Sequence, residues 1–94
     1  TGIKPKVIEE IRTFARKYNI DKVILFGSRA RGDYRRTSDI DLAVYGGNFD
    51  RFALDVNEET STLLQFDIVD ADRKMQPELR ESIEKEGVVL YEKI

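Results

Sequence analysis

Apolar residues recur at two different spacings along this chain, and the changes of spacing predict its elements. Over residues 5–18 they recur every three or four positions, which predicts an amphipathic helix opened by Pro5. Residues 22–26 form a short run of β-branched and aromatic side chains, which is typical of a strand. We expect a short helical turn after Ser28 and a second strand over residues 39–45, which two glycines end.

The second half of the chain continues this alternation. Apolar residues from Phe49 to Leu64, with Leu63 among them, predict a third helix with a polar middle, and residues 65–69 predict a third strand. Pro77 opens a final helix that Gly87 is placed to end, and residues 88–91 are expected to form a last short strand. This order of elements predicts an α/β (α+β) fold, a small mixed sheet of about four strands with helices packed on it.

Composition narrows the class of protein. The 94 residues suit a single domain, expected to cover residues 1–94, and 40% hydrophobic content is typical of a globular protein. A net charge of −2 argues against general nucleic-acid binding. No apolar run approaches the ~20 residues of a membrane span, and no apolar signal-peptide region is expected at the N-terminus.

Two residue types that often carry catalysis are missing from the sequence, and their absence restricts its chemistry. The chain has no cysteine and no histidine, which excludes disulfides, thiolate zinc sites and cysteine nucleophiles and removes the usual general base. Carboxylates, hydroxyls, lysine, arginine and backbone groups remain, and carboxylate ligands favour Mg²⁺. The lack of cysteine also favours a reducing, cytoplasmic compartment.

Acidic residues are expected to gather on one face of the sheet. Side chains two positions apart on a strand share a face, roughly 6.6 Å apart, so Asp39 and Asp41 point the same way. Asp67 joins them if the third strand lies beside the second in suitable register. Like charges ~4 Å apart repel by about 4 kcal/mol at an effective dielectric near 20, so such a group requires a cation. Taken singly, each aspartate is more often a solvated acid, and the combination of all three with the glycine-serine turn is what favours a site. Asp70 and Asp72 are expected to be turn residues.

A glycine-serine turn follows the first predicted strand. Gly27 permits close backbone approach, and Ser28 with the following backbone amides can bind the oxygens of a phosphate. Four arginines lie within the next residues, at positions 29, 31, 35 and 36. Arginine pairs well with phosphate, and Arg29 is nearest the turn, although a solvated basic loop is the alternative interpretation.

The combined pattern is Gly27-Ser28, ten residues, then Asp39-x-Asp41. It resembles the Gly-Ser-x10-Asp-x-Asp signature of the DNA polymerase β-like nucleotidyltransferase superfamily. The similarity extends over nearly the whole chain and is strongest to the minimal nucleotidyltransferases, the antitoxin-type partners of HEPN proteins. The segments that resemble this group most are residues 26–32, 38–44, 66–69 and 87–92.

The resemblance implies a nucleoside triphosphate bound through two Mg²⁺ ions and attacked in line at its α-phosphate, with release of pyrophosphate. The implied metal ligands and catalytic residues are Asp39, Asp41 and Asp67, of which the last would help to deprotonate the attacking hydroxyl. The implied nucleotide-binding residues are Gly27, Ser28 and Arg29.

The identity of the acceptor follows from the same resemblance. In the minimal group ATP donates AMP to a hydroxyl, often a tyrosine, of the cognate HEPN toxin, and this adenylylation silences its RNase activity. Since little sequence follows the fourth predicted strand, we expect a partner or an oligomer to supply the acceptor. A binding-only antitoxin and a nucleotidyltransferase for a small hydroxylated molecule, such as an antibiotic, are the alternatives. The three intact aspartates favour catalysis, and the lack of an acceptor domain disfavours the small molecule.

Overall fold

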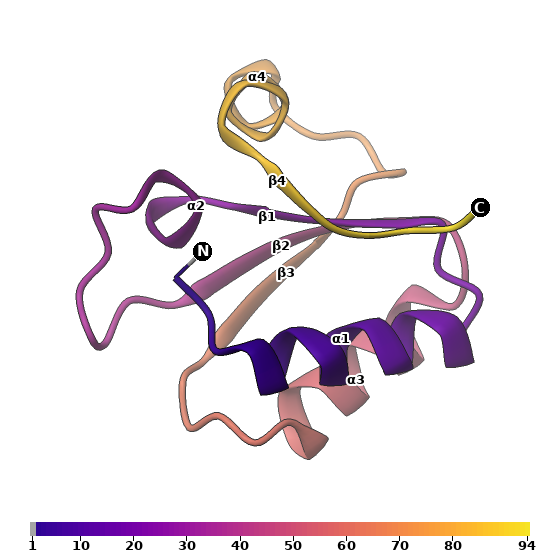
Figure 1. Ribbon diagram of the computed structural model, residues 1–94. Coiled ribbons are helices and arrows are strands. Elements are labelled where there is room, and N and C mark those ends of the chain that lie inside the picture. The colour runs from indigo at the N-terminus through magenta and orange to yellow at the C-terminus, as the bar shows by residue number, and fades with distance from the viewer. Residues whose placement is uncertain (1) are drawn as a thin grey trace.

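A four-stranded mixed sheet is the centre of the computed structural model, which describes residues 2–94 (Figure 1). Its strands lie in the order β3-β2-β1-β4. Strand β1 runs antiparallel to both β2 and β4, whereas β2 and β3 are parallel. The predicted mixed sheet with packed helices is confirmed. The strands are β1 (Lys22–Phe26), β2 (Ile40–Tyr45), β3 (Phe66–Asp70) and β4 (Val88–Glu92).

Helices cover the two faces of the sheet unequally. The longer helices α1 (Pro5–Lys17) and α3 (Phe49–Glu59) lie together on one face, and α4 (Pro77–Glu86) lies on the other, beside β4 (Figure 1). The short α2 (Ser28–Arg31) directly follows β1. Among the described residues, no helix combines the length and the apolar character needed to cross a bilayer.

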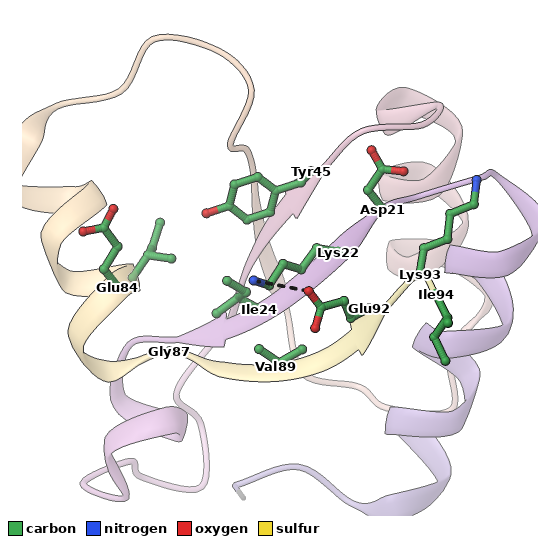
Figure 2. Close-up of a pocket in the computed structure, with 11 residues that line it drawn as sticks. Asp21, Lys22, Ile24, Tyr45, Glu84, Gly87, Val89, Glu92, Lys93 and Ile94 are labelled. Atoms are coloured by element: carbon green, nitrogen blue, oxygen red, sulfur yellow. Dashed lines mark ion pairs between the residues drawn. The ribbon is translucent and has the colours of Figure 1, made fainter.

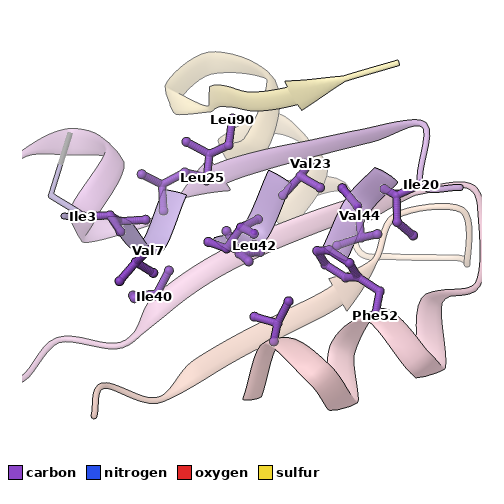
Figure 3. Close-up of a cluster of buried hydrophobic side chains, with 13 residues drawn as sticks. Ile3, Val7, Ile20, Val23, Leu25, Ile40, Leu42, Val44, Phe52 and Leu90 are labelled. Carbon is purple, nitrogen blue, oxygen red and sulfur yellow. The ribbon is translucent and has the colours of Figure 1, made fainter. Parts of the chain in front are cut away.

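The main core lies between the sheet and the two longer helices (Figure 3). Ile40, Leu42 and Val44 alternate along β2 and are at most 1% exposed, as the two-residue period predicts. They pack with fully buried side chains from both helices, such as Ile11 and Phe52. Burying each such side chain contributes about 1.5–3 kcal/mol, which fixes the face that β2 turns inward. The intervening Asp41 must therefore point to the opposite face.

The third helix is shorter than its apolar pattern predicts. It ends at Glu59, and Leu63 lies outside it with its side chain fully exposed, so its predicted place in the helix is wrong. The reason is a contact distant in sequence: the Glu10 carboxylate of α1 accepts hydrogen bonds from the amide and the hydroxyl of Ser61. This contact replaces the hydrogen bonds of a further helical turn.

Of the two acids predicted to be turn residues, one lies in a turn and the other ends the third strand. Asp70 is the last residue of β3 rather than a turn residue. Asp72 lies in the turn, where its carboxylate accepts a hydrogen bond from the amide of Gly46 at 2.6 Å. Asp72 is therefore explained by the local structure and needs no ligand.

Candidate active site

The register of the two parallel strands brings two acids together. Asp41 of β2 lies opposite Asp67 of β3, and on its other side it lies opposite Phe26, the last residue of β1. Val69 packs in the apolar cluster on the face of the sheet that α4 covers. Asp67 lies two residues before Val69 on the same strand, so it shares that face. The expected register of the third strand is thus confirmed.

Asp39 lies just outside the sheet. The strand begins one residue later than predicted, at Ile40, whose amide donates to the carbonyl of Gln65 at 2.9 Å. Asp39 and Asp67 are exposed, whereas Asp41 is partly buried. The acids therefore present one sheltered carboxylate between two that reach solvent.

Electrostatics show that these acids influence one another. Burial is the main factor that raises the pKa of Asp41 above its ordinary value, and the negative charges of Asp67 and Asp39 raise it further. The positive charge of Arg31 partly opposes this shift. Asp41 is therefore a position where a bound cation would relieve both burial and like-charge repulsion.

The donor chemistry of this position suits a divalent cation, although the ligands are not preassembled. Within residues 2–94, no three acidic side chains are gathered closely enough to form a ready metal site. Like charges repel at short range, so carboxylates that share a face separate when no cation lies between them. Oxygen donors of this kind are the ligands that Mg²⁺ takes. Asp41 and Asp67 on the sheet, with Asp39 directly before β2, thus fit a divalent cation in chemistry and in placement at one end of the strands.

The glycine-serine turn lies against the central acid. Gly27 has φ +76°, and a Cβ atom added to it would lie 2.2 Å from the Oδ2 atom of Asp41. Both the backbone angle and the space therefore require glycine. Ser28 begins α2 directly afterwards, where the first backbone amides of a helical turn have no acceptor within the helix. The structure thus brings the two halves of the sequence signature, the turn and Asp41, into contact.

Arg29 occupies a different environment from the one predicted for it. Its side chain is buried, 5% exposed for the residue, and donates four hydrogen bonds to backbone carbonyls. A guanidinium has five N–H donors, so little capacity remains for phosphate. These contacts do not favour the predicted role of Arg29 in nucleotide binding. The acceptors are the carbonyls of Gly2, Arg35, Arg36 and Ser38.

Arg31 is the arginine of this region that lies within electrostatic reach of the acids. It follows Ser28 by three residues in α2, so the two share a side of the helical turn. Its guanidinium pairs with Glu86 at 2.9 Å and with Asp33 at 3.3 Å, and its side chain is 42% exposed. Sequence reasoning gave more weight to Arg29 because it is nearer the turn. The three-residue spacing from Ser28 was the sequence feature that could have identified Arg31 as the arginine on the same side of the helical turn.

A hollow of about 890 Å³ opens on the same face of the sheet, but at the opposite end of the strands (Figure 2). Lys22 and Tyr45 lie opposite each other at this end of β1 and β2, whereas Phe26 and Asp41 pair at the other end. The side chains of Ile24 and Val89 contribute apolar surface to the hollow. It lies away from the acids and is not part of the candidate active site.

Comparison with known proteins identifies relatives of this chain. The family model of polymerase beta nucleotidyltransferases matches residues 9–94. MJ0604 of Methanocaldococcus jannaschii, whose name assigns it as a protein adenylyltransferase, is 35% identical over 99 residues, covering 92% of this chain and 96% of its own length. Two solved structures each match 92% of this chain and 73% of their own. One is a toxin-antitoxin with AMP-PNP (TM-score 0.70, 23% identity), and one is a mutant of the toxin-antitoxin MntA-HpeT (TM-score 0.71, 20% identity).

The fold, the turn and the strand acids define a nucleotidyltransferase. The chain belongs to the polymerase beta nucleotidyltransferase family, because the family model covers nearly its whole length. The predicted membership in the superfamily is confirmed. The two toxin-antitoxin structures share the fold, in agreement with the minimal, antitoxin-type members that the sequence resembles.

Proposed function

We propose that this protein is the antitoxin of a HEPN toxin and transfers AMP from ATP to a tyrosine hydroxyl of that toxin. The observation that supports this most is the register of Asp41 with Asp67, directly beside the Gly27–Ser28 turn. The glycine-serine turn, to which we assign phosphate binding, and two carboxylates lie at the same end of the sheet. Phosphoryl-transfer sites require these two elements together.

Each residue has a distinct role in this proposal. Gly27 and Ser28 bind the triphosphate through the backbone amides and the hydroxyl of the turn. Arg31 pairs with phosphate oxygens, because its exposed ion pairs with Glu86 and Asp33 are weak enough to exchange.

The acids complete the site. Asp39, Asp41 and Asp67 would hold two Mg²⁺ ions, which would neutralise phosphate charge during the transfer. The acceptor oxygen bonds to the α-phosphorus while the bond to the β-phosphate breaks, and pyrophosphate leaves. Asp67, the more exposed of the two register-paired acids, takes the proton of the attacking hydroxyl. The chain has no histidine, so a carboxylate has to fill the role of base.

The comparisons support the nature of the acceptor and of the nucleotide. MJ0604 is named for adenylyl transfer to proteins, and it matches this chain over nearly the full length of both. The similar structure that contains AMP-PNP is a toxin-antitoxin. A protein hydroxyl as acceptor and an adenine nucleotide as donor are consistent with both.

A binding-only antitoxin is the second candidate. The observation in its favour is that, among the described residues, the acids are not gathered as a ready metal site. In this alternative the protein would silence its partner by forming a complex, and the aspartates would serve no chemical purpose.

One experiment separates the two candidates. The protein is incubated with a candidate HEPN toxin, Mg²⁺ and each nucleoside triphosphate in turn, and the intact mass of the toxin is measured. We expect a gain of one AMP on the toxin with ATP, lost when Asp39 and Asp41 are both replaced by asparagine. Glu58→Gln, on the exposed surface of α3, is the matched control and should transfer normally. A tight complex that neutralises the toxin without a mass gain would support binding alone.

A further inference from the structure

Among residues 2–94, Arg29 is the one buried charged residue, and its contacts are unusual. Its Nε atom donates to the carbonyl of Ser38 at 3.0 Å, and its Nη2 atom donates to those of Arg35 and Arg36, both at 3.2 Å. The ring of Tyr34 lies 4.7 Å from the guanidinium carbon. Burying a cation costs free energy unless its N–H donors are hydrogen-bonded, so the backbone of residues 35–38 must keep its conformation while Arg29 stays buried.

These acceptors belong to one segment, residues 32–39, which we call the spacer loop. It connects α2 to β2, and it has no helix or strand of its own to fix its path. Ser38 adds a second brace: its amide donates to the carbonyl of Arg35 at 3.0 Å, and its hydroxyl accepts from the amide of Arg35 at 2.8 Å. The bonds to Arg29 and the Ser38 brace thus replace the missing secondary structure.

The loop ends at the candidate metal site. Asp39 directly follows Ser38, whose carbonyl Arg29 holds, and Asp39 itself precedes the first paired residue of β2. At its other end, Arg29 is the second residue of α2, directly after Ser28. A single side chain therefore connects the glycine-serine turn to the residue before the first aspartate of the signature.

We infer that Arg29 is a positioning residue: its guanidinium fixes the spacer loop and so holds Asp39 beside the Gly27–Ser28 turn and Asp41. The part of this inference that concerns metal binding rests on the proposed function. The part that concerns the path of the loop does not. Arg29 acts through the backbone carbonyls of the loop and does not contact the nucleotide.

Hydrogen exchange tests the path of the loop without any ligand. In Arg29→Gln we expect the amides of residues 34–40 to exchange about tenfold faster, with α1 and β1 unchanged. Arg29→Lys keeps the charge but not the planar guanidinium, so its amide exchange rates should lie between those of the native protein and those of Arg29→Gln. Arg36→Gln is the matched control, because it removes one positive charge from the spacer loop while the backbone carbonyl of residue 36 remains. Unchanged exchange in Arg29→Gln, or an equal effect in Arg36→Gln, would overturn the inference.

Metal binding tests the consequence for Asp39. Mn²⁺ affinity is measured by electron paramagnetic resonance in the presence of AMP-PNP, and AMP-PNP affinity is measured separately at saturating Mn²⁺. We expect Arg29→Gln to weaken Mn²⁺ binding by about tenfold, as loss of an outer-shell partner does, and to leave nucleotide affinity within about twofold. Lost nucleotide affinity at saturating metal, with loop exchange unchanged, would make Arg29 a phosphate ligand and overturn the inference.

Two further outcomes keep the test decisive. If Arg29→Gln does not fold, Ser38→Ala takes its place, because it removes the second brace and leaves Arg29 intact; it should accelerate exchange in the same segment to a smaller degree. If the native protein binds no Mn²⁺ with AMP-PNP, the proposed function fails. The exchange measurements then decide the role of Arg29 in the loop by themselves.

Discussion

Gly27 and Asp41 lie so close that a methyl group on the glycine would stand 2.2 Å from a carboxylate oxygen. Gly27 directly follows β1, and Asp41 lies fourteen positions later in the sequence, on the neighbouring strand β2. Their contact explains why the signature combines a glycine with the second of its two aspartates. The glycine lets the Gly27–Ser28 turn approach Asp41 more closely than any other residue would.

Replacing Gly27 by alanine tests this contact. We expect Gly27→Ala to lower the free energy of unfolding by about 1–3 kcal/mol, because the left-handed backbone and the clash with Asp41 both oppose it. It should also lower transfer by about a hundredfold, since displacement of a catalytic group by about 1 Å has an effect of this size. Chemical denaturation and the transfer assay measure the two effects.

Gly32→Ala is the matched control for the backbone angle. Gly32 has φ +94° but no heavy atom within 4 Å of an added Cβ. It should lose about 1 kcal/mol of stability through its backbone angle alone and keep most of its activity. If both variants lose activity equally, the strain of a left-handed residue explains the result, and the contact with Asp41 does not.

The shifted pKa of Asp41 predicts how stability depends on pH. Burial and the charges of Asp67 and Asp39 raise its pKa in the folded state above its ordinary value of 3.8. The folded state then holds this proton to higher pH than the unfolded state does, so ionisation of Asp41 lowers stability as the pH rises through this window. In Asp41→Asn we expect higher stability than the native protein at neutral pH and equal stability below the ordinary pKa. Urea denaturation across this pH range measures the difference.

Mg²⁺ provides the control for this prediction. A cation at the acids favours ionised Asp41, so saturating Mg²⁺ should stabilise the native protein at neutral pH and have little effect on Asp41→Asn. Equal stabilisation of both proteins by Mg²⁺ would place the cation elsewhere.

Much of this site was predictable, because strands follow a short and strict period. Alternation alone turns Asp41 and Asp67 away from their neighbours Leu42 and Ile68, which pack in the main core. The parallel register that joins them is a tertiary contact, but it follows once the strands are neighbours.

Other features depend on contacts that no periodic pattern encodes. The side chain of Arg29 binds carbonyls of a loop whose path is irregular, so no sequence spacing predicts these contacts. The third helix ends early because Glu10, fifty-one positions before Ser61, binds that residue. In both cases a side chain satisfies backbone groups at a distance, which overrides local preference.

We expect Arg31 to contribute to nucleotide affinity, whereas its exposed ion pairs contribute little to the free energy of unfolding. We expect Arg31→Gln to weaken nucleotide affinity by about tenfold, the effect of one charge-assisted hydrogen bond. Glu86→Gln removes its partner at an exposed position, so it should change stability by less than about 1 kcal/mol and leave nucleotide binding as tight or tighter. Isothermal titration with AMP-PNP measures both. Weakened binding in Glu86→Gln would mean that the ion pair holds Arg31 in its productive position.

The main core predicts a contrast between two apolar residues of the same region. Phe52 is fully buried, so Phe52→Ala should lower the free energy of unfolding by about 3–5 kcal/mol. Leu63 is fully exposed beyond the end of α3, and Leu63→Ala should change it by less than about 0.5 kcal/mol. Urea denaturation compares the two variants. A large loss of unfolding free energy in Leu63→Ala would mean that Leu63 is buried in the core, which would contradict the observed end of α3.

Asp67→Asn separates the chemistry of this site from binding of the partner. The substitution keeps the size of the side chain but removes its charge and its capacity to accept a proton, so we expect transfer to fall by about 10²–10⁴-fold. The complex with the toxin should persist, since a neutral isostere leaves the surface unchanged in shape. Because the charge of Asp67 contributes to the raised pKa of Asp41, the same variant should lower that pKa, which carboxyl NMR titration can follow. Asp50→Asn, an exposed acid on α3, should change none of these quantities. A lowered pKa with full transfer would establish that the two acids interact but that Asp67 is not the base, and the proton would then have to leave through another group.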